Sequence, residues 1–262
     1  MRKINLSIIV VNYRSRAYLE KCLASIFAKI GFGVSLEVIV VNNDAESEMR
    51  GLAALFPGIK IIQNSENNGF GGANNLGAKE ALGEILLFLN PDTEIIYHNV
   101  EDVMAEFEND SALGILGSGL MTSDGKIQKW TSGSKVSLWS VLRNNLKNSN
   151  NDKLWQNQKR LEVFWVAGTA MFISKALFLE LHGFDVNFFM YFEDVDICNR
   201  THLFGKKVVY FPKFLVLHHG GKSFLARKEQ KKKYYQSQDY YFQKHFGWFQ
   251  LGLLKFLRFF SL

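Results

Sequence analysis

Continuous apolar runs alternate with helix-like segments along the first third of the chain. The runs are rich in Val, Ile and Leu and cover residues 6–11, 36–41, 59–62 and 85–89. Helix-like segments lie between them at residues 18–27, 46–55 and 73–82. In the first segment, apolar positions recur at the spacing of one buried helical face: Leu19, Cys22, Leu23, Ile26 and Phe27. Strands that read as nearly continuous apolar runs need cover on both faces, so the pattern predicts an α/β fold with a Rossmann-like, mostly parallel sheet flanked by helices.

Polar residues directly follow three of the four predicted strands. They read Asn12-Tyr13, Asn42-Asn43-Asp44 and Asn90-Pro91-Asp92. Open parallel sheets bind their ligands beyond the carboxyl ends of the strands. The polar ends therefore predict a ligand site at this edge of the sheet.

The second half of the chain has a less regular pattern. Residues 121–160 are polar and interrupted by Gly, Ser and Asn, and we expect a loop at residues 147–153. Further along, apolar residues resume at 163–173, a helix is expected over 175–181, an aromatic and acidic segment covers 188–200, and two short strands are expected at 208–211 and 214–217. The sequence contains no internal repeat and no low-complexity tract.

The composition is that of a globular protein with a full core. The chain has 262 residues, of which 47% are hydrophobic. The apolar run near the N-terminus is too short for a signal peptide and lacks a small-residue cleavage site, so we interpret it as a strand. No run of about eighteen apolar residues predicts a membrane span. Cys22 and Cys198 match no metal-ligand spacing, which favours a reduced, cytoplasmic setting.

The positive charge of the chain is confined to its last residues. The net charge is +6, and residues 226–262 hold eight basic and two acidic side chains, so residues 1–225 are neutral. Lys255 and Arg258 lie beside an apolar helical face and can extend toward a polar surface. That face consists of Phe249, Leu253, Phe256, Leu257 and Phe260. The tail therefore predicts an amphipathic helix on an anionic membrane surface, with packing against the domain, or against a second subunit in a homodimer, as the alternative.

A nucleic-acid-binding protein is a further interpretation of the basic tail. The sequence pI of about 9.1 and the aromatic residues between the tail lysines favour it. A nucleic-acid enzyme, however, usually spreads basic groups around its cleft, whereas residues 1–225 are neutral and contain no recognisable nucleic-acid module. We therefore expect no nucleic-acid partner.

Two acidic segments can carry chemistry. Asp92 follows a buried strand directly, where a carboxylate can hold a divalent cation that neutralises a diphosphate; the structural alternative is an ordinary turn. Glu193, Asp194 and Asp196 lie within four residues, beside several aromatic side chains. Apolar surroundings raise carboxyl pKa values, which suits a general base, whereas the alternative is a helix start favoured by the helix dipole. Both interpretations hold together, since Arg200 can pair with one of the acids.

Two glycine-containing segments complete the candidate chemistry. His218 ends an apolar segment and precedes a histidine and two glycines; histidine is a common metal ligand, but a single one is more often structural. The segment from Asn67 to Asn74 reads NNGFGGAN and can place backbone N–H groups near phosphate at a helix start. It is not a P-loop, because no Gly-Lys-Ser/Thr follows, and it lies too far along the chain for the dinucleotide fingerprint. These departures argue against a nicotinamide enzyme.

In order and spacing, these segments resemble glycosyltransferase family 2, which has the GT-A fold. Within that family the chain is similar to the rhamnosyltransferase-like enzymes of surface polysaccharide assembly. The resemblance covers residues 6–247 and rests on these motifs: SIIVVNY with YLEKCLASI behind it, EVIVVNND, NSENNGFGGANNLG, LFLNPDTE, WVAGTAMFISKALFLELHGFD, FFMYFEDVDICNR and HHGGKS. The last three blocks, in that order, are too specific for chance.

The resemblance implies a role for each matching residue. Asp194 would be the catalytic base, with Glu193 beside it. Asp92 and His218 would hold Mg²⁺ or Mn²⁺. The nucleotide sugar would be bound by Asn12, Tyr13, Asn42, Asp44, Asn67, Gly69, Asn74, Asn90 and Asp92, and the acceptor by Trp165, Gly168 and Asp196.

Two of these positions depart from the pattern of the family. Asn42 stands where an aspartate usually accepts the N3–H of the base; an amide oxygen can accept that bond, but without the assistance of a charge. Asn90 replaces the first acid of the Asp-x-Asp motif, a form that this subgroup often has. Asp92 would then be the principal metal ligand.

The resemblance also implies the reaction and its setting. A single displacement would transfer a sugar, with L-rhamnose from dTDP-rhamnose favoured, and would invert the anomeric configuration. The acceptor would be a polyprenyl-diphosphate-linked glycan at the inner face of the plasma membrane. Residues 1–225 would form the GT-A domain, with a nucleotide-sugar half at 1–120 and an acceptor half at 121–225, and residues 226–262 would form the membrane-associating tail. A uridine-diphosphate sugar donor and a non-catalytic nucleotide-sugar-binding relative stay open as alternatives.

Overall fold

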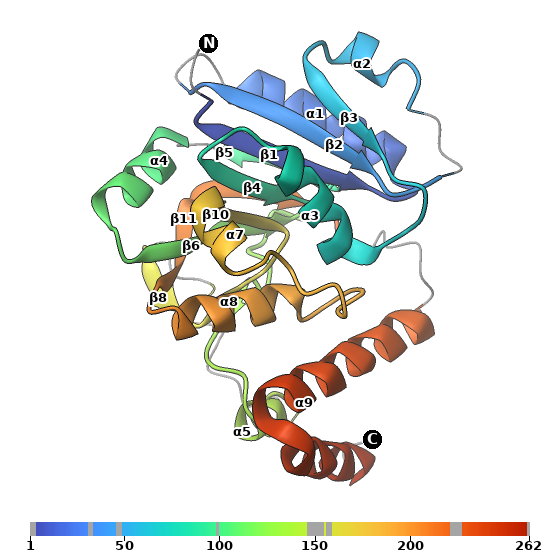
Figure 1. The fold of residues 1–262 in the computed structure, drawn as a ribbon, viewed down its shortest axis with the longest axis vertical. Coiled ribbons are helices and arrows are strands. Elements are labelled where there is room, and N and C mark those ends of the chain that lie inside the picture. The colour runs from blue at the N-terminus through green and yellow to red at the C-terminus, as the bar shows by residue number, and fades with distance from the viewer. Residues whose placement is uncertain are drawn as a thin grey trace.

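The computed structural model describes residues 4–30, 34–45, 49–97, 100–145, 155, 159–220 and 227–260. Its elements, drawn in Figure 1, are β1 (Leu6–Asn12), α1 (Arg16–Lys29), β2 (Leu36–Asn42), α2 (Leu52–Leu55), β3 (Ile59–Gln63), α3 (Gly69–Glu80), β4 (Ile85–Leu89), β5 (Thr93–Tyr97), α4 (Val100–Asn109), β6 (Leu113–Thr122), β7 (Ser132–Gly133), α5 (Leu138–Asn145), β8 (Leu161–Val163), β9 (Trp165–Val166), β10 (Ala170–Ser174), α7 (Lys175–Glu180), α8 (Glu193–Leu203), β11 (Lys207–His218) and α9 (Arg227–Phe260).

One large sheet forms the centre of the molecule. Its strand order is β3-β2-β1-β4-β10-β6-β11-β5, and β8 pairs with β11. The first four strands in this order are parallel to one another, whereas β10 runs antiparallel to both β4 and β6. The strands β7 and β9 form a separate two-stranded sheet. The predicted α/β fold with a mostly parallel, Rossmann-like sheet is confirmed, and antiparallel strands are added in the second half of the chain.

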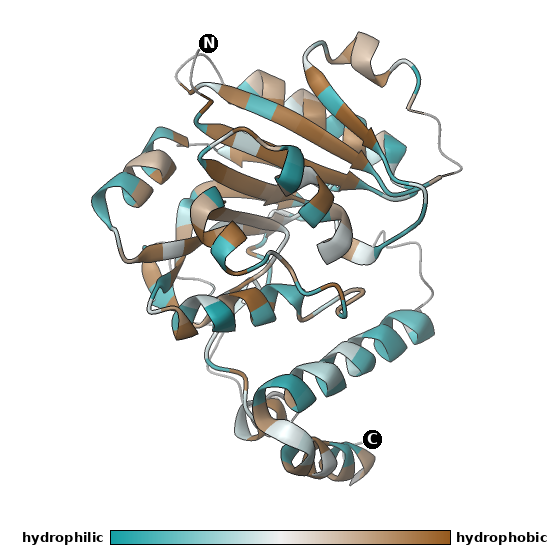
Figure 2. Cartoon of the chain, viewed as in Figure 1, coloured by the Kyte–Doolittle hydropathy of each residue, from teal (hydrophilic) through white to brown (hydrophobic). Residues whose placement is uncertain are grey.

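Helices cover both faces of this sheet (Figure 1). Side chains of α1 and α4 pack into the core on one face, around Leu19, Ile26 and Val103. Side chains of α3, α7 and α8 pack into the core on the other face. Ala73 of α3 and Phe178 of α7 lie in this core, together with buried apolar residues of α8. Because both faces are covered, the central strands are mostly apolar, as the brown strands of Figure 2 show.

The four strands predicted in the first third of the chain are confirmed, and all three helices begin at different residues. The helix α1 begins at Arg16, two residues before the predicted start. The structure has α2 only from Leu52, after Gly51 at a φ of 77°, while residues 46–48 lie outside the described part of the chain. In contrast, α3 begins at Gly69, four residues before the predicted start. The loop predicted at residues 147–153 also lies outside the described residues.

The two short strands predicted at 208–211 and 214–217 are one continuous strand, β11. Its pairing with β6 shifts register between Phe211 and Leu215, and Pro212 lies in this irregular stretch. A proline cannot donate to a strand ladder, so strands accommodate it at a bulge. The bulge keeps the whole strand in the sheet and brings His218 to its carboxyl end.

The tail folds as α9, which is interrupted at Gly247. That glycine has a φ of 81° and a ψ of 177°, so two helical parts meet there at an angle (Figure 1). Leu251 and Leu254 of the second part are buried against aromatic residues of the body, including Phe188 and Phe192. Within the described residues, no helix combines the length and the apolar character needed to cross a membrane.

Candidate active site

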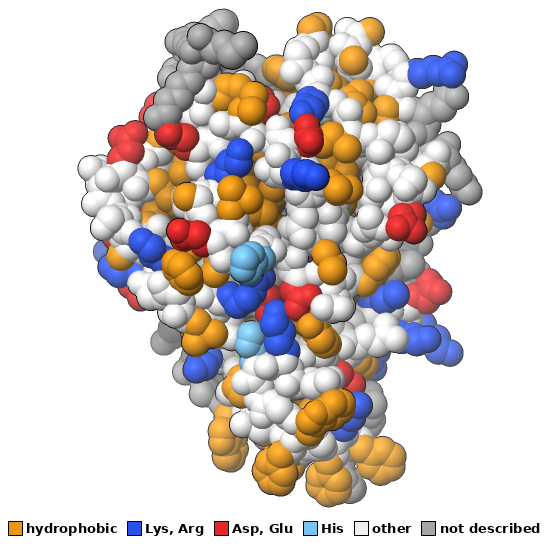
Figure 3. All heavy atoms as spheres, in the orientation of Figure 1, with side chains coloured by type: hydrophobic (Ala, Val, Ile, Leu, Met, Phe, Trp, Pro, Cys, Tyr) orange, Lys and Arg blue, Asp and Glu red, His pale blue; other side chains and the backbone are white. Residues whose placement is uncertain are grey.

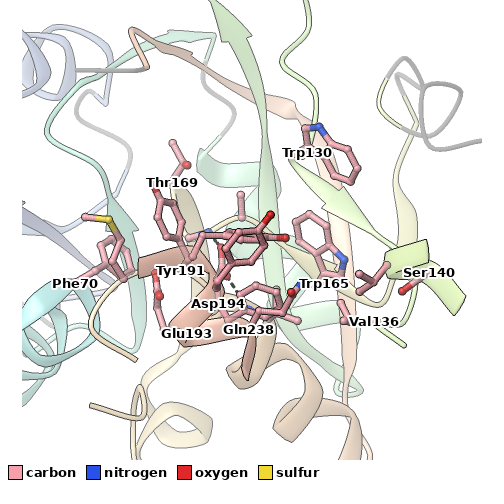
Figure 4. Close-up of a pocket in the computed structure, with 18 of the residues that line it drawn as sticks. Phe70, Trp130, Val136, Ser140, Trp165, Thr169, Tyr191, Glu193, Asp194 and Gln238 are labelled. Carbon is pink, nitrogen blue, oxygen red and sulfur yellow. Dashed lines mark hydrogen bonds between the residues drawn. The ribbon is translucent and has the colours of Figure 1, made fainter. Parts of the chain in front are cut away.

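A cavity of about 760 Å³ lies beyond the carboxyl end of β4, between the sheet, α8 and α9 (Figure 4). It is the meeting point of segments that are far apart in sequence. The predicted site residues that line it are Asn90, Asp92, Trp165, Gly168, Glu193, Asp194 and His218. The cavity therefore joins the residues predicted for metal, acceptor and catalysis.

Strand pairing brings Asp92 and His218 together. His218 at the end of β11 pairs with Thr93 at the start of β5, and the N–H of His219 donates to the carbonyl of Asp92 at 2.9 Å. As a result, Nε2 of His218 lies 3.3 Å from Oδ1 of Asp92. The neighbouring histidine points away from this pair, since Nε2 of His219 lies 2.6 Å from Oε1 of Glu94.

Asp92 and His218 fit a divalent cation. Two adjacent ligands at about 2.1 Å from one ion lie roughly 3.0 Å apart, close to the separation found here. Nδ1 of His218 is 2.8 Å from Oε1 of Gln128, an oxygen that can only accept. This contact at Nδ1 leaves Nε2 directed at Asp92, the arrangement that metal-binding histidines commonly have. No group of three or more His, Cys, Asp or Glu side chains suited to a metal occurs in the described ranges; Mg²⁺ commonly takes further ligands from phosphate and water.

Asp194 lies at the start of α8 and faces the cavity. Its Oδ2 accepts a hydrogen bond from the backbone N–H of Gly168 at 2.9 Å, and its Oδ1 accepts one from the N–H of Val195 at 2.8 Å. Burial raises the pKa of Asp194, and the two backbone N–H groups oppose that rise. A carboxylate with a raised pKa that is still held in its charged form by N–H donors has the properties of a general base.

Glu193 is the neighbour of Asp194 and has a different environment. It is 6% exposed, and its Oε2 has no hydrogen-bond partner in the described structure. Burial, followed by the charge of Asp194, raises its pKa well above the usual value. Burial therefore disfavours the charged form of both acids, but Asp194 has an N–H donor on each oxygen, whereas Oε2 of Glu193 has no partner among the described residues.

The turn before α8 has an unusual backbone. Tyr191 and Phe192 both have positive φ values, 69° and 67°. Two consecutive non-glycine residues in the left-handed region cost free energy, and the surrounding packing must hold them there. Figure 4 shows Tyr191 beside Asp194 in the cavity. The strained turn thus sets the direction in which α8 presents its first acids.

The predicted nucleotide residues at the ends of β1 and β2 form a network of amides with Gln63 of β3. Asn12 and Asn42 are partners in the parallel register of β1 and β2, and Nδ2 of Asn12 donates to Oδ1 of Asn42 at 2.8 Å. Nδ2 of Asn42 donates in turn to the carbonyl of Asp44 and to Oε1 of Gln63, both at 2.9 Å. Tyr13 follows this network, is 37% exposed, and has the guanidinium of the next residue over its ring. These residues do not line the cavity, and base binding by them stays a prediction.

The remaining predicted nucleotide residues lie at the start of α3. Oδ1 of Asn67 accepts from the N–H of Gly69 at 3.0 Å, and Nδ2 of Asn74 donates to the carbonyl of Phe70 at 3.0 Å. Gly69 has a φ of 73°, and a Cβ there would lie 2.3 Å from the carbonyl oxygen of Phe189. The N–H of Phe70 donates to that same oxygen at 3.1 Å. The segment at the start of α3 therefore packs closely against the loop that leads into the turn before α8.

Asp196 does not line the cavity, although we expected it to contact the acceptor. Its side chain is fully buried, with Oδ2 2.7 Å from Nε of Arg200 and Oδ1 2.7 Å from Nζ of Lys244 and 2.8 Å from Nε2 of His245. Nδ1 of His245 lies 3.0 Å from Nδ2 of Asn199, also on α8. Burial would raise the pKa of Asp196, but these cationic and hydrogen-bonding partners lower it. Both carboxylate oxygens of Asp196 are bonded to other residues of the protein, so this side chain links α8 to α9.

A second carboxylate anchors α9 to the loop before α8. Oδ2 of Asp185 accepts from Nζ of Lys244 at 2.7 Å and from the hydroxyl of Tyr240 at 3.0 Å. Burial opposes ionisation of Asp185, yet the bonds from Lys244 and Asn187 lower its pKa to about 2. The hydroxyl of Ser237 donates to the carbonyl of Met190 at 2.7 Å. Residues of α9 therefore hold in place both α8 and the loop that precedes it.

Sequence reasoning missed the contribution of α9 to the cavity wall. The wall includes Tyr234, Tyr235, Gln238, Leu254, Leu257 and Arg258. These residues recur at helical spacing, which was a usable signal for a buried face. The aromatic and basic character of the tail instead suggested a surface, and only the kink at Gly247 lets both parts of α9 reach the cavity.

The family of the chain can be read from its sequence match. The family profile described as "Glycosyl transferase family 2" matches residues 7–181, which include the parallel strands, the Asp92 turn and the Gly168 turn. The chain belongs to glycosyltransferase family 2.

Curated relatives of this glycosyltransferase are named as sugar transferases. "Low-salt glycan biosynthesis hexosyltransferase Agl10" of Haloferax volcanii is 29% identical over 75% of this chain and 61% of its own length. "N-acetylglucosaminyl-diphospho-decaprenol L-rhamnosyltransferase" of Mycobacterium tuberculosis is 24% identical over 97% of this chain and 89% of its own. "Rhamnosyltransferase WbbL" of Escherichia coli is 25% identical over 84% and 86%. The chain thus spans less than two thirds of the first of these proteins and most of the other two.

Solved structures similar to this glycosyltransferase have the GT-A fold. GalNAc-T7, solved with UDP, GalNAc and Mn²⁺, has a TM-score of 0.67 at 16% identity, over 83% of this chain and 44% of its own. Mannosyltransferase PcManGT from Pyrobaculum calidifontis, solved with GDP-Man and Mn²⁺, has a TM-score of 0.56 at 17% identity, over 86% and 59%. At such identities the likeness establishes the fold, and the predicted GT-A fold is confirmed.

Proposed function

We propose that this glycosyltransferase is an inverting, metal-assisted hexosyltransferase that transfers a sugar from a nucleotide diphosphate to a lipid-linked glycan. The observation that carries the proposal is the position of Asp194, a carboxylate held by backbone N–H groups in the same cavity as Asp92 and His218. A base and a candidate cation site that face one cavity are the two parts that a single displacement requires.

In this reaction Asp194 takes the proton from the acceptor hydroxyl. The oxygen forms a bond to the anomeric carbon as the bond from that carbon to the diphosphate breaks, so one displacement inverts the configuration. A bound Mg²⁺ or Mn²⁺ supplies positive charge for the leaving diphosphate. The N–H of Gly168 favours the charged form of this carboxylate and holds its Oδ2 in place. Burial favours the neutral form of the neighbouring Glu193.

The donor and acceptor follow from the relatives. Two of the curated relatives are named rhamnosyltransferases, which supports L-rhamnose, with dTDP-rhamnose as the favoured donor. The name of the mycobacterial relative includes a diphospho-decaprenol acceptor, which supports a polyprenyl-diphosphate-linked glycan. The relative named as a hexosyltransferase supports other nucleotide sugars, such as uridine-diphosphate hexoses, as the second candidate for the donor.

A lipid-linked acceptor implies work at a membrane surface, and we place the enzyme at the inner face of the plasma membrane. The second part of α9 supports this assignment because several of its large apolar side chains are exposed. Trp248 is 73% exposed, Phe249 85% and Phe259 79%. Exposed aromatic residues on a helix with a basic run upstream suit an anionic lipid surface.

The test is a calorimetric titration of the enzyme with nucleotide sugars in Mn²⁺ and in EDTA, alongside Asp92→Ala. We expect dTDP-rhamnose to bind most tightly and Asp92→Ala to remove the metal-dependent part of the affinity. Asp124→Ala is the matched control, because Asp124 is an exposed acid outside the cavity.

Each outcome of this titration has a distinct meaning. Tight binding of uridine-diphosphate sugars alone would replace the rhamnosyl donor and leave the reaction class in place. Equal effects of Asp92→Ala and Asp124→Ala would reject the metal site. Binding of no nucleotide sugar, with or without Mn²⁺, would overturn the proposal in favour of a non-catalytic relative.

A further inference from the structure

Arg258 lies in the wall of the active-site cavity, although its sequence position suggested that it extends toward lipid. Its side chain is 17% exposed, whereas that of Lys255, one turn earlier, is 58% exposed. The guanidinium stacks over the ring of Tyr235, 4.3 Å from the centroid. Two acceptors on the first part of α9, Gln238 and Asp239, fix it further. Arg258 therefore belongs to the site and not to the outer surface of the helix.

The hydrogen bonds of Arg258 leave part of the guanidinium available. Nη2 donates to Oε1 of Gln238 and to Oδ1 of Asp239, both at 2.7 Å. Nε and Nη1 have no partner among the described residues. The guanidinium is held by Nη2 and by the ring, so its remaining donors are preorganised for a ligand.

Arg258 is the one Lys or Arg among the described residues that line the cavity. The acids there are Asp92, Glu193 and Asp194, and His218 lies beside Asp92. The cavity therefore has acids and a candidate cation site at its catalytic side, and on α9 a guanidinium that Asp239 partly neutralises. Guanidinium groups bind phosphate oxygens with paired hydrogen bonds, so the remaining donors of Arg258 suit a phosphate.

The cavity wall around Arg258 is apolar. Leu254 and Leu257 lie on the same turn of α9 and also line the cavity. Val136, Leu138 and Val141, at α5 and just before it, line the cavity with them and pack against the same buried cluster. A phosphate-binding group surrounded by apolar side chains matches a ligand with a charged part joined to a hydrocarbon chain.

The apolar wall continues onto the outside of the molecule. Leu253 and Phe256, which are adjacent in sequence to the cavity residues Leu254 and Leu257, are 40% and 59% exposed. Consecutive residues of a helix point about 100° apart, so the two sides of this helix are neighbours. Figure 3 shows hydrophobic side chains gathered at the lower end of the molecule, where Figure 1 draws the end of α9.

We propose that Arg258 binds the diphosphate of a prenyl-diphosphate-linked acceptor, and that Leu254, Leu257 and the α5 region hold the first isoprene units. The inference rests on the proposed transfer to a lipid-linked acceptor and assigns the recognition of its lipid end. The acceptor sugar then lies toward Asp194, and the hydrocarbon chain leaves along α9 toward the exposed apolar face. The tail is in this way part of the acceptor site.

The test is a binding measurement with farnesyl diphosphate as the probe, by calorimetry in EDTA and below the concentration at which it forms micelles. EDTA removes divalent metal, so that Asp92 and His218 cannot hold the diphosphate. Loss of a charge-assisted bond should weaken binding by roughly 10- to 100-fold in Arg258→Gln. Lys255→Gln is the matched control, since Lys255 also pairs with Asp239 but does not line the cavity. It should change the affinity less than about 2-fold.

Two further probes separate the parts of the site. Farnesol, which lacks the diphosphate, should bind equally to the wild type and to Arg258→Gln. Asp92→Ala should bind farnesyl diphosphate as the wild type does, which distinguishes this site from the donor site. Where Arg258→Gln does not fold, Arg258→Lys keeps the charge without the planar fork and should still weaken binding several-fold more than Lys255→Gln.

Three results would overturn the inference: unchanged affinity in Arg258→Gln, equal weakening in Lys255→Gln, or weakening in Asp92→Ala without metal. Donor binding is measured separately with Mn²⁺ and nucleotide sugars. Failure of donor binding would reject the proposed function while leaving the prenyl-diphosphate result readable. Failure at Arg258 with normal donor binding would reject only the acceptor assignment.

Discussion

The carboxylate of Asp194 accepts a hydrogen bond from the backbone N–H of Gly168 at 2.9 Å. The next residue, Thr169, accepts from the N–H of Asn90 at 2.9 Å through its carbonyl. The catalytic acid of α8 is therefore linked by two backbone contacts to the turn that carries Asp92. Base and candidate metal ligand keep a fixed relation because the antiparallel pairing of β10 with β4 holds both ends of this link.

Replacement of Asp194 by asparagine should abolish most of the transfer activity. The amide keeps the size of the side chain but cannot take a proton, and loss of a general base typically costs about 10²- to 10⁴-fold in rate. Binding of the nucleotide sugar should be unchanged, since Asp194 acts on the acceptor. We would measure kcat by release of the nucleoside diphosphate and donor affinity by calorimetry.

Glu193→Gln is the matched variant for this experiment. Burial favours the neutral form of Glu193, so a neutral amide of the same size should reduce kcat less than about 10-fold. A loss in Glu193→Gln as large as that in Asp194→Asn would mean that the glutamate carries the charge and acts as the base.

The rate should fall toward acid pH earlier than an ordinary aspartate would allow. Asp194 acts only when deprotonated, and burial raises its pKa above the usual value of about 3.9. The acid limb of the pH profile of kcat/KM, measured at saturating Mn²⁺, reports the pKa of Asp194. The apparent pKa of this limb should lie above the usual aspartate value of about 3.9. Metal affinity measured over the same range separates loss of the metal from protonation of Asp194. An acid limb at or below pH 3.9 would contradict the assignment.

The parallel half of the fold was predictable because its strands are nearly continuous apolar runs. The strand β6 was not, since Gly114, Gly117 and Gly119 interrupt its apolar pattern. Packing accounts for the second of these glycines: a Cβ on Gly117 would lie 2.4 Å from Cβ of Val166. The need for a glycine at this position comes from packing against a residue far along the chain, so the strand propensity of the local sequence does not reveal it.

The catalytic side of the cavity was predictable from motif order, and its α9 wall was not. Asp92, Asp194 and His218 stand in recognisable motifs, and all three line the cavity. Arg258 stands in a helix whose apolar and basic residues suit either a membrane or a protein partner. The side that packs inward depends on the kink at Gly247 and on the contacts made after it, which spacing alone does not specify.

Gly69→Ala should destabilise the contact between α3 and the loop that precedes α8. A Cβ at this position would lie 2.3 Å from the carbonyl oxygen of Phe189, so the loop must move and the Phe70 bond to that oxygen is lost. We expect a loss of about 1–3 kcal/mol in the free energy of unfolding, together with a reduced kcat, because the loop leads into the Tyr191 turn. Urea unfolding and product release would measure the two effects.

Gly51→Ala separates the backbone cost from the clash. Gly51 has a similar φ of 77°, but a Cβ there meets nothing within 4 Å. It should carry only the cost of the left-handed conformation, about 1 kcal/mol, and leave kcat unchanged. Equal effects of the two variants on stability and on kcat would contradict the fitted contact at Gly69.

Asp196→Asn should release α9 from α8. The variant leaves Arg200 and Lys244 without their buried carboxylate, and removal of one partner from a buried ion pair costs roughly 3–5 kcal/mol. Because the pKa of Asp196 is lowered in the folded state, its contribution is present above the unfolded pKa of about 3.9 and is lost as the pH falls further. Urea unfolding should therefore separate variant and wild type at pH 7 and bring them together toward acid pH. Glu80→Gln, which breaks an exposed pair with Lys60, should change stability little at either pH. An Asp196→Asn protein as stable as the wild type at pH 7 would mean that apolar packing of Leu251 and Leu254, and not the buried charge, holds the tail.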